Sequence, residues 1–149
     1  MSDSLDVIIV DDDPAVCEVV SKVIKRFYTW GQVHSFTKPE EALTFCQKRK
    51  ATVAIFILDV FMGEETGFNF LESIVDKFPL AFQDTIIITG NASDDVVNMC
   101  IASDITFLLE KPIRLYALQL AVRAIVAKYI KFAKKLLREL PRLGQRISP

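Results

Sequence analysis

The sequence predicts an α/β fold: a doubly wound parallel sheet of five strands, with helices on both faces and an extended last helix. Two patterns lead to this prediction. Short apolar runs of strand length alternate along the chain with segments whose apolar residues recur every three or four positions. The connections between them are only a few residues long, and right-handed crossovers then place helices on both faces of the sheet. The apolar share of 51% suits such a two-sided core.

The first strand is expected at Val7 to Val10, and it ends at three consecutive aspartates, Asp11 to Asp13. Pro14 suits the first position of a helix, so Asp13 is expected to cap that helix. Apolar residues at spacings of three and four predict that the helix has one buried face. These residues are Val16, Val19, Val20, Val23, Ile24 and Phe27.

The second and third strands are expected at Gln32 to Phe36 and at Val53 to Leu58. Between them, Thr37 to Glu40 fits a capping box at the start of a helix. The third strand is apolar throughout, as is typical of a strand buried on both faces, and it ends at Asp59. A loop with two glycines then leads to a helix that Pro79 closes. The apolar face of that helix is predicted to carry Phe68, Leu71, Val75 and Phe78.

The fourth strand is expected at Thr85 to Thr89 and the fifth at Thr106 to Leu109, with a helix after Ser93 between them. The fifth strand is followed by Glu110-Lys111-Pro112. For strands that alternate with helices in this way, the flavodoxin-like order 2-1-3-4-5 is the simplest arrangement. In that order the carboxyl ends of strands one and three flank the crevice in which ligands bind.

The last helix is expected to begin near Leu115 and to end at Leu140, because Pro141 follows. Its apolar residues form a heptad pattern of Leu115, Leu118, Val122, Ile125, Tyr129, Phe132 and Leu136. The first half of this pattern fits a stripe packed on the sheet, whereas the second half extends beyond the expected body. That second half could form a homodimer, serve as a stalk toward a partner, or fold back on its own domain.

Charge divides the chain near the same place. The segment after residue 127 carries a net charge of +6, whereas the first 127 residues carry −7. We therefore separate a domain over residues 5–128 from an extension over residues 129–149. A homodimer or stalk through the last helix is the preferred role of the extension, ahead of nucleic acid or a membrane surface. The polar first residues and the short apolar runs favour a cytoplasmic protein.

Cysteine and histidine usage argues against several kinds of site. Cys17, Cys46 and Cys100 lack metal-binding spacing and fall at apolar positions of predicted helices, so buried thiols are expected. His34 is the single histidine, which argues against His-based triads and multi-histidine metal sites. It falls in the second strand, where a partly exposed position is expected.

Carboxylates from two strand ends are expected to meet in the crevice. Asp11 and Asp12 follow the first strand and Asp59 ends the third, although each alone could simply cap a helix or close a turn. Three converging carboxylates raise each other's pKa unless a cation joins them. Oxygen ligands without His or Cys favour Mg²⁺, which commonly shares its site with a phosphate group.

The ends of strands four and five add groups that suit phosphate. Thr89 offers a hydroxyl and Lys111 an ammonium, and Gly90 leaves room beside them. An aspartate carboxylate can attack a phosphoryl group and form an acyl phosphate, while a metal ion and a lysine neutralise the transferring charge. Four of the five strands thus end in residues of complementary chemistry, which predicts a phosphoryl-transfer site around Asp59.

The chain resembles the receiver domain of two-component response regulators, of the chemotaxis type. The similarity covers roughly residues 5 to 128. It rests on Ile9-Val10-Asp11-Asp12, on Leu58-Asp59 with Met62 and Gly67 downstream, on Ile88-Thr89-Gly90, and on Glu110-Lys111-Pro112-Ile113.

This resemblance implies a phosphorelay role in which Asp59 accepts a phosphoryl group from a sensor histidine kinase or a histidine phosphotransfer protein. Asp11, Asp12, Asp59 and the main-chain carbonyl of Phe61 would hold Mg²⁺. Thr89 and Lys111 would bind the phosphoryl oxygens. The bond between Lys111 and Pro112 would be cis, as X-Pro bonds can be.

Two positions depart from the family pattern. Gly63 stands where most relatives have proline, which should loosen the loop after Asp59. The position three residues before the lysine usually carries Tyr or Phe, and its inward rotation reports phosphorylation, but here it is Leu108. Phe107, one residue earlier, is expected to point to the opposite sheet face. We therefore expect Thr89 still to respond to phosphorylation. We expect Leu108 to alter how this response reaches the surface formed by the last two strands.

Two other functions fit parts of the same pattern. Asp11 to Asp13 also resemble the first motif of haloacid dehalogenase-like phosphatases, in which Asp11 would be the nucleophile. That family has an acidic pair after its lysine, whereas no acidic residue follows Lys111 until Glu139. A pseudo-receiver that only binds partners is the non-catalytic alternative, and Leu108 keeps it open.

Overall fold

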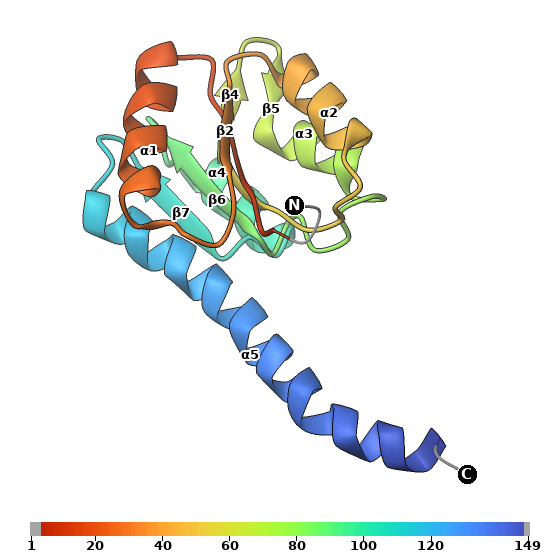
Figure 1. The fold of residues 1–149 in the computed structure, drawn as a ribbon. Coiled ribbons are helices and arrows are strands. Elements are labelled where there is room, and N and C mark those ends of the chain that lie inside the picture. Colours follow the sequence, from red (N-terminus) through yellow and green to blue (C-terminus); the bar gives the residue numbers. More distant parts are fainter. Residues whose placement is uncertain (1–3, 148–149) are drawn as a thin grey trace.

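The computed structural model describes the backbone of residues 4–147 and the side chains of residues 4–139. Five parallel strands form one sheet in the order β2-β1-β3-β6-β7, which confirms the order predicted from the sequence (Figure 1). The elements are β1 (Val7–Val10), α1 (Pro14–Phe27), β2 (Val33–Phe36), α2 (Pro39–Lys48), β3 (Ile55–Asp59), β4 (Phe61–Met62), β5 (Glu65–Thr66), α3 (Gly67–Ile74), β6 (Thr85–Thr89), α4 (Asp94–Ala102), β7 (Phe107–Glu110) and α5 (Leu115–Ile147).

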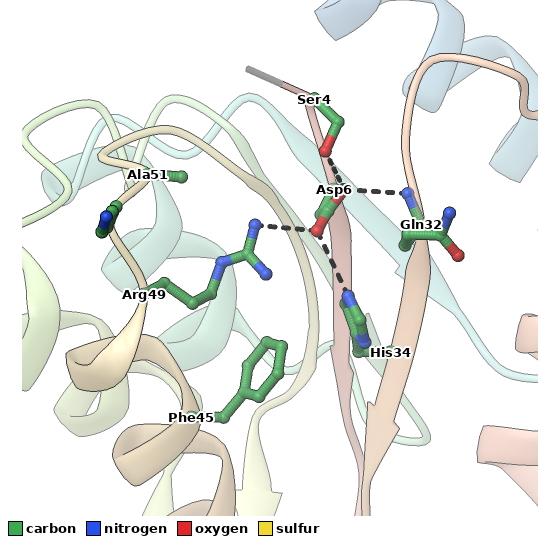
Figure 2. A pocket seen from close by; sticks show the side chains of 8 residues that line it. Ser4, Asp6, Gln32, His34, Phe45, Arg49 and Ala51 are labelled. Atoms are coloured by element: carbon green, nitrogen blue, oxygen red, sulfur yellow. Dashed lines mark hydrogen bonds and ion pairs between the residues drawn. The ribbon is translucent and has the colours of Figure 1, made fainter. Parts of the chain in front are cut away.

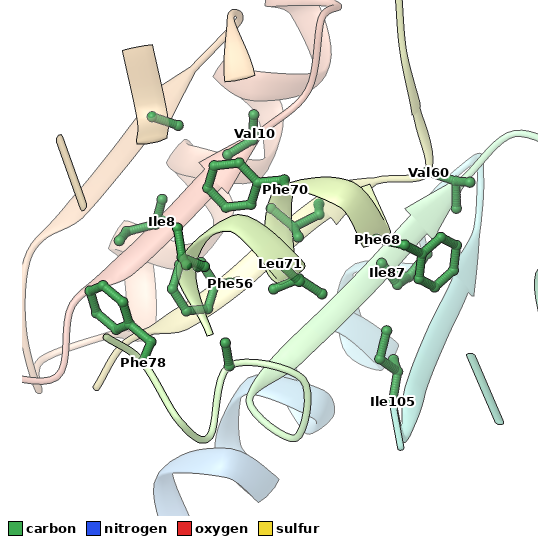
Figure 3. Packing of buried hydrophobic residues seen from close by; sticks show 14 of the residues in the cluster. Ile8, Val10, Phe56, Val60, Phe68, Phe70, Leu71, Phe78, Ile87 and Ile105 are labelled. Carbon is green, nitrogen blue, oxygen red and sulfur yellow. The ribbon is translucent and has the colours of Figure 1, made fainter. Parts of the chain in front are cut away.

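The sheet separates two hydrophobic cores. Successive side chains of a strand point to opposite faces, so Ile8 and Val10 join one core while Val7 and Ile9 join the other. Helices α2, α3 and α4 cover the first face, and α1 and α5 cover the second. Figure 3 shows the first core, in which the ring of Phe56 lies edge-on to the rings of two other phenylalanines, Phe70 and Phe78.

Helix α2 does not begin with the predicted capping box. Its first residue is Pro39, and Lys38 occupies the N-cap position without a side-chain capping bond. The fixed φ of proline suits the first helical position, so the helix starts there and Thr37 falls outside the cap. The predicted cap of α1 is confirmed, because the Asp13 carboxylate accepts a hydrogen bond from the Ala15 N–H at 2.9 Å.

Two helices differ from the prediction, one in its buried face and the other in its end. In α1, Val19 is 54% exposed because the buried face is centred on Cys17, Val20 and Ile24. Helix α3 ends at Ile74, earlier than predicted.

The segment that follows α3 is still part of the core. Phe78 is buried beyond the helix end, where its N–H donates to the Ile74 carbonyl. A residue that precedes proline is disfavoured in the helical conformation, and Pro79 follows directly. Pro79 therefore disfavours a helical conformation at Phe78, while the buried packing that began in α3 continues to this residue.

The loop after Asp59 contains a small hairpin that the sequence did not predict. Strands β4 and β5 pair in antiparallel register, Phe61 opposite Thr66 and Met62 opposite Glu65. Gly63 makes the turn with a positive φ of 67°, a conformation that glycine adopts without steric cost.

Helix α5 is longer than predicted, since it continues through Pro141 to Ile147. A proline removes one helical hydrogen bond, but the turns on either side of it can remain helical. The stripe on the sheet consists of Leu118, Val122 and Ile125, whereas Leu115 is 50% exposed at the helix start. Figure 1 shows that the helix then leaves the body, and residues 131–139 are all exposed.

A buried carboxylate fixes α5 at the point where it leaves the body. Asp84 is buried just before β6 and pairs with the Lys128 ammonium while it accepts a hydrogen bond from the Tyr129 hydroxyl. Burial raises the pKa of Tyr129, and the charge of Asp84 adds to the shift. Helix α5 is therefore held by packing on the sheet along its first part and by Asp84 at the end of that part.

The remaining sequence predictions concern burial. Cys17, Cys46 and Cys100 are all buried free thiols, as expected. His34 is half-buried, and its Nε2 lies 3.2 Å from an Asp6 carboxylate oxygen. Across the part of the chain described here, no helix is both long and apolar enough to cross a bilayer.

Asp6 precedes β1 at the amino-terminal edge of the sheet, whereas Asp59 ends β3 at the opposite edge. Figure 2 shows Asp6 among its partners Ser4, Gln32, His34 and Arg49. It is 3% exposed, and its carboxylate accepts hydrogen bonds from the Gln32 N–H and the Ser4 hydroxyl, both at 2.8 Å. Its other oxygen lies 2.7 Å from Nη2 of Arg49. Burial alone would raise the pKa of Asp6, but these partners together lower it below its ordinary value.

Asp6→Asn is expected to lower the free energy of unfolding by about 2 kcal/mol near pH 7, because Arg49 loses its charged partner. A depressed carboxylate pKa stabilises the fold above the unfolded-state value of about 3.9, and this contribution is lost as pH falls through the folded-state pKa. Urea denaturation at pH 7 and toward pH 3 should therefore show the deficit shrinking in acid. Asp76→Asn, at an exposed site, is the control. A deficit of equal size at both pH values would contradict this account.

Candidate functional site

Four strand ends bring the predicted site residues to one edge of the sheet. Val10 of β1 is the register partner of Leu58 of β3, so the next residues, Asp11 and Asp59, follow at adjacent strand ends. Thr89 is the last residue of β6, and its register partner is the last residue of β7, directly before Lys111. The topology therefore gathers the four ends as the sequence predicted.

The three carboxylates of Asp11, Asp12 and Asp59 form one cluster. One oxygen from each lies within 4.8 Å of the others. Asp11 and Asp59 are buried and Asp12 is exposed, so the cluster opens to solvent on the Asp12 side. The Asp11 carboxylate also accepts a hydrogen bond from the Asp13 N–H at 2.9 Å, which orients it.

Lys111 bridges two of these carboxylates. Its Nζ lies 3.0 Å from an Asp11 oxygen and 3.1 Å from an Asp59 oxygen. Burial alone would lower the pKa of Lys111, but the hydrogen bonds and charges of Asp11 and Asp59 raise it above its usual value. Burial raises the pKa of Asp11 and the nearby Asp59 charge adds to the effect, while the Asp13 N–H and Lys111 oppose it.

The donor set fits a hard divalent cation. Three carboxylates and one ammonium leave an excess of negative charge when all are ionised, and every available ligand atom is oxygen. Magnesium takes one or two carboxylates together with waters and phosphate oxygens. Asp11, Asp12 and Asp59 could therefore hold Mg²⁺. The main-chain carbonyl of Phe61 as a further ligand stays a prediction.

Thr89 lies at the same edge with its hydroxyl held locally. It is 1% exposed, and its Oγ1 accepts from the Asn91 N–H at 3.3 Å while it lies 3.4 Å from the Asn91 carbonyl. Gly90 faces open space in the direction of a side chain, since an added Cβ would meet no atom within 4 Å. The room predicted beside Thr89 is therefore present.

Gly67 lies beside the site, and its place in a motif was the only sign in the sequence that a glycine is needed there. An added Cβ at this position would lie 2.6 Å from the main-chain oxygen of Asp59, closer than a side chain tolerates. The start of α3 thus packs directly on the backbone of Asp59. The thiol of Cys17 supports the neighbouring strand in a similar way, since it donates to the Asp11 carbonyl at 3.2 Å.

The last strand differs on its two faces, as expected. Leu108 packs against the core beneath α2, α3 and α4, whereas Phe107 and Leu109 pack against the core beneath α1 and α5. The bond between Lys111 and Pro112 is cis, as predicted.

Comparisons with known proteins agree with this geometry. A family model described as response regulator receiver domain matches residues 7–123. The chain is similar to Heme response regulator HssR of Staphylococcus saprophyticus, with 27% identity over 122 residues that make up 82% of this chain and 51% of HssR. It is also similar to Two-component response regulator ARR2 of Arabidopsis thaliana, with 28% identity over 84% of this chain and 18% of ARR2.

A solved structure supports the fold. The chemotaxis protein CheY4 of Vibrio cholerae matches with a TM-score of 0.70 and 22% identity, over 82% of this chain and 98% of CheY4. The chain spans about half the length of HssR and less than a fifth of ARR2. These comparisons therefore concern the domain that carries the carboxylate cluster.

Proposed function

Because the chain belongs to the family of response regulator receiver domains, whose model matches residues 7–123, we propose that it is the phosphoacceptor of a two-component signalling system. The observation that carries this proposal is the position of Lys111 Nζ, 3.0 Å from Asp11 and 3.1 Å from Asp59, beside the exposed carboxylate of Asp12. Asp59 is the acceptor in this proposal. The phosphoryl donor is a phosphohistidine on a sensor histidine kinase or a histidine phosphotransfer protein, in the cytoplasm.

The side chains around Asp59 suggest how the phosphoryl group is transferred to it. A carboxylate oxygen of Asp59 attacks phosphorus, the bond from phosphorus to the donor imidazole breaks, and the imidazole nitrogen keeps the electron pair. Lys111 moves from its bridge onto a phosphoryl oxygen, and the Thr89 hydroxyl donates to another. Asp11, Asp12 and Asp59 would hold Mg²⁺, which when bound supplies positive charge to the transferring group. The switch acts through Thr89 and changes partner binding or self-association.

The test is incubation with acetyl phosphate and Mg²⁺, followed by intact mass measurement of the wild type and of Asp59→Asn. A phosphoryl adduct that is absent in Asp59→Asn and in samples treated with EDTA is expected. Turnover of acetyl phosphate without an adduct would favour a phosphatase with Asp11 as nucleophile. Neither adduct nor turnover would favour a pseudo-receiver that only binds partners.

Leu108 is proposed to change how phosphorylation is transmitted to binding partners. It stands in place of the aromatic switch residue, on the sheet face beneath α4. Leu108→Ala is expected to weaken the coupling between phosphorylation and self-association by about fivefold, close to 1 kcal/mol. The measurement is the dissociation constant from light scattering, with and without acetyl phosphate. Leu109→Ala is the matched control, since its side chain packs on the opposite face. Equal coupling in the wild type and in Leu108→Ala would contradict the proposal.

A further inference from the structure

An apolar groove lies beside the carboxylate cluster, on the face covered by α3 and α4. It has a volume of about 470 Å³, and we call it the α3/α4 groove. Val60, Phe68 and Val96 form buried walls, while Phe61 and Met99 line it although they are 56% and 45% exposed. Large apolar side chains left open to water in a hollow are typical of a surface that binds another protein.

The rim of the α3/α4 groove is acidic. Asp95 lines it directly, and Asp94, Glu64 and Glu65 lie in the same two segments, all exposed. Residues 60–70 and 91–103, which form the groove, contain no lysine or arginine. The groove therefore suits an apolar partner surface that is flanked by positive charge.

The exposed part of α5 has the complementary composition. Beyond Tyr129, Phe132 and Leu137 are 67% and 65% exposed, and Leu136 is 47% exposed. Phe132 and Leu136 are four residues apart, so they share one helix face, and they continue the stripe that packs on the sheet. The interleaved basic residues are Lys131, Lys134, Lys135 and Arg138. We call residues 130–139 the α5 tail.

A straight α5 cannot place its tail in the groove of its own chain. The helix packs with α1 on one face of the sheet, whereas α3 and α4 form the groove on the other face. Figure 1 shows the tail leaving the body altogether. The two complementary surfaces of one chain can therefore meet only between copies.

We propose that the α5 tail of one copy docks in the α3/α4 groove of a second copy, and that the two copies exchange tails reciprocally. Phe132 and Leu136 enter between Phe61 and Met99, in the manner of an amphipathic helix bound in a groove. The basic residues of the tail then face the acidic rim. Reciprocal exchange closes the assembly as a twofold dimer and prevents an open chain of copies.

Direct pairing of two tails fits the charges less well. It would bring two basic helices together, and the heptad position after Leu136 is Glu139, which interrupts the apolar seam. Docking in the groove instead places opposite charges together and covers Phe61 and Met99. This inference concerns the chain without a phosphoryl group, so it does not rest on phosphorylation of Asp59.

The test measures self-association of the full chain by light scattering and sedimentation, in the absence of any phosphodonor. The wild type is expected to be a dimer whose dissociation constant rises with salt, because the contact pairs opposite charges. Met99→Glu in the groove and Phe132→Glu in the tail should each raise the dissociation constant by about 30-fold. Ile101→Glu is the matched control, since Ile101 is 70% exposed on the same helix as Met99 but does not line the groove.

Mixing the two variants separates the two arrangements. A mixed pair keeps one intact tail, on Met99→Glu, and one intact groove, on Phe132→Glu, so heterodimers should form where neither variant associates alone. If the tails instead paired with each other, Met99→Glu would dimerise like the wild type and mixing would rescue nothing. A monomeric wild type at about 100 μM, a concentration that detects even weak dimers, would also overturn the proposal.

Discussion

Replacement of Lys111 by methionine is expected to slow phosphorylation of the chain by acetyl phosphate about 100-fold. Lys111 is the basic residue seen to bridge Asp11 and Asp59, and removal of one preorganised donor from a reacting group commonly costs a factor of this size. The rate is measured as growth of the phosphoryl adduct by intact mass, at saturating Mg²⁺.

The same substitution leaves two buried carboxylates facing each other without a cation. We expect the free energy of unfolding of Lys111→Met to fall by about 2 kcal/mol at pH 7 in EDTA, and part of this loss to return in Mg²⁺. Lys25→Met, at an exposed position of α1, controls for the loss of a positive charge. An unchanged phosphorylation rate in folded Lys111→Met would remove Lys111 from the proposed mechanism.

Phe56→Ala is expected to give the largest loss of stability, about 3 to 5 kcal/mol. The Phe56 side chain is fully buried on β3, with ring centroids 6.2 Å from Phe70 and 5.5 Å from Phe78. Truncation removes both aromatic contacts and leaves a cavity at a fully buried position. Urea denaturation measures the change as a shift in midpoint at constant slope.

Phe132→Ala is the matched control for Phe56→Ala, because Phe132 is 67% exposed. Its unfolding free energy should stay within about 0.5 kcal/mol of the wild type at low protein concentration. A loss below about 1 kcal/mol for Phe56→Ala would contradict this prediction, because it would mean that neighbouring side chains move in and fill the cavity.

The strands and the site were the most predictable parts of the molecule. Strands buried on both faces need continuous apolar runs, so β1, β3 and β6 are visible in the sequence as such runs. The carboxyl ends of parallel strands lie at one edge of the sheet. Once the strand order is known, Asp59 and Lys111 are therefore expected to lie near each other, as they do. Strand order and strand ends therefore carried most of the information about the site.

Helix boundaries and close approaches were less predictable because they depend on tertiary contacts. Val19 has the right spacing for burial, but the orientation of α1 on the sheet leaves it exposed. The hairpin at Phe61 to Thr66 consists of two-residue strands, too short for any periodic pattern. Gly67 at the start of α3 lies close to the backbone of Asp59 in β3. How closely two such elements approach each other cannot be read from a single sequence.

The length of α5 means that a small movement of its packed half produces a larger displacement at its far end. The helix is held by the sheet and by Asp84 as far as Tyr129, and it continues as one helix to Ile147, about 27 Å farther on. A tilt of α5 by about 10° on the sheet would displace its far end by about 5 Å, while the packed half would move much less. A movement of the packed half that is too small to alter the core thus becomes a shift at the far end that a binding partner can distinguish.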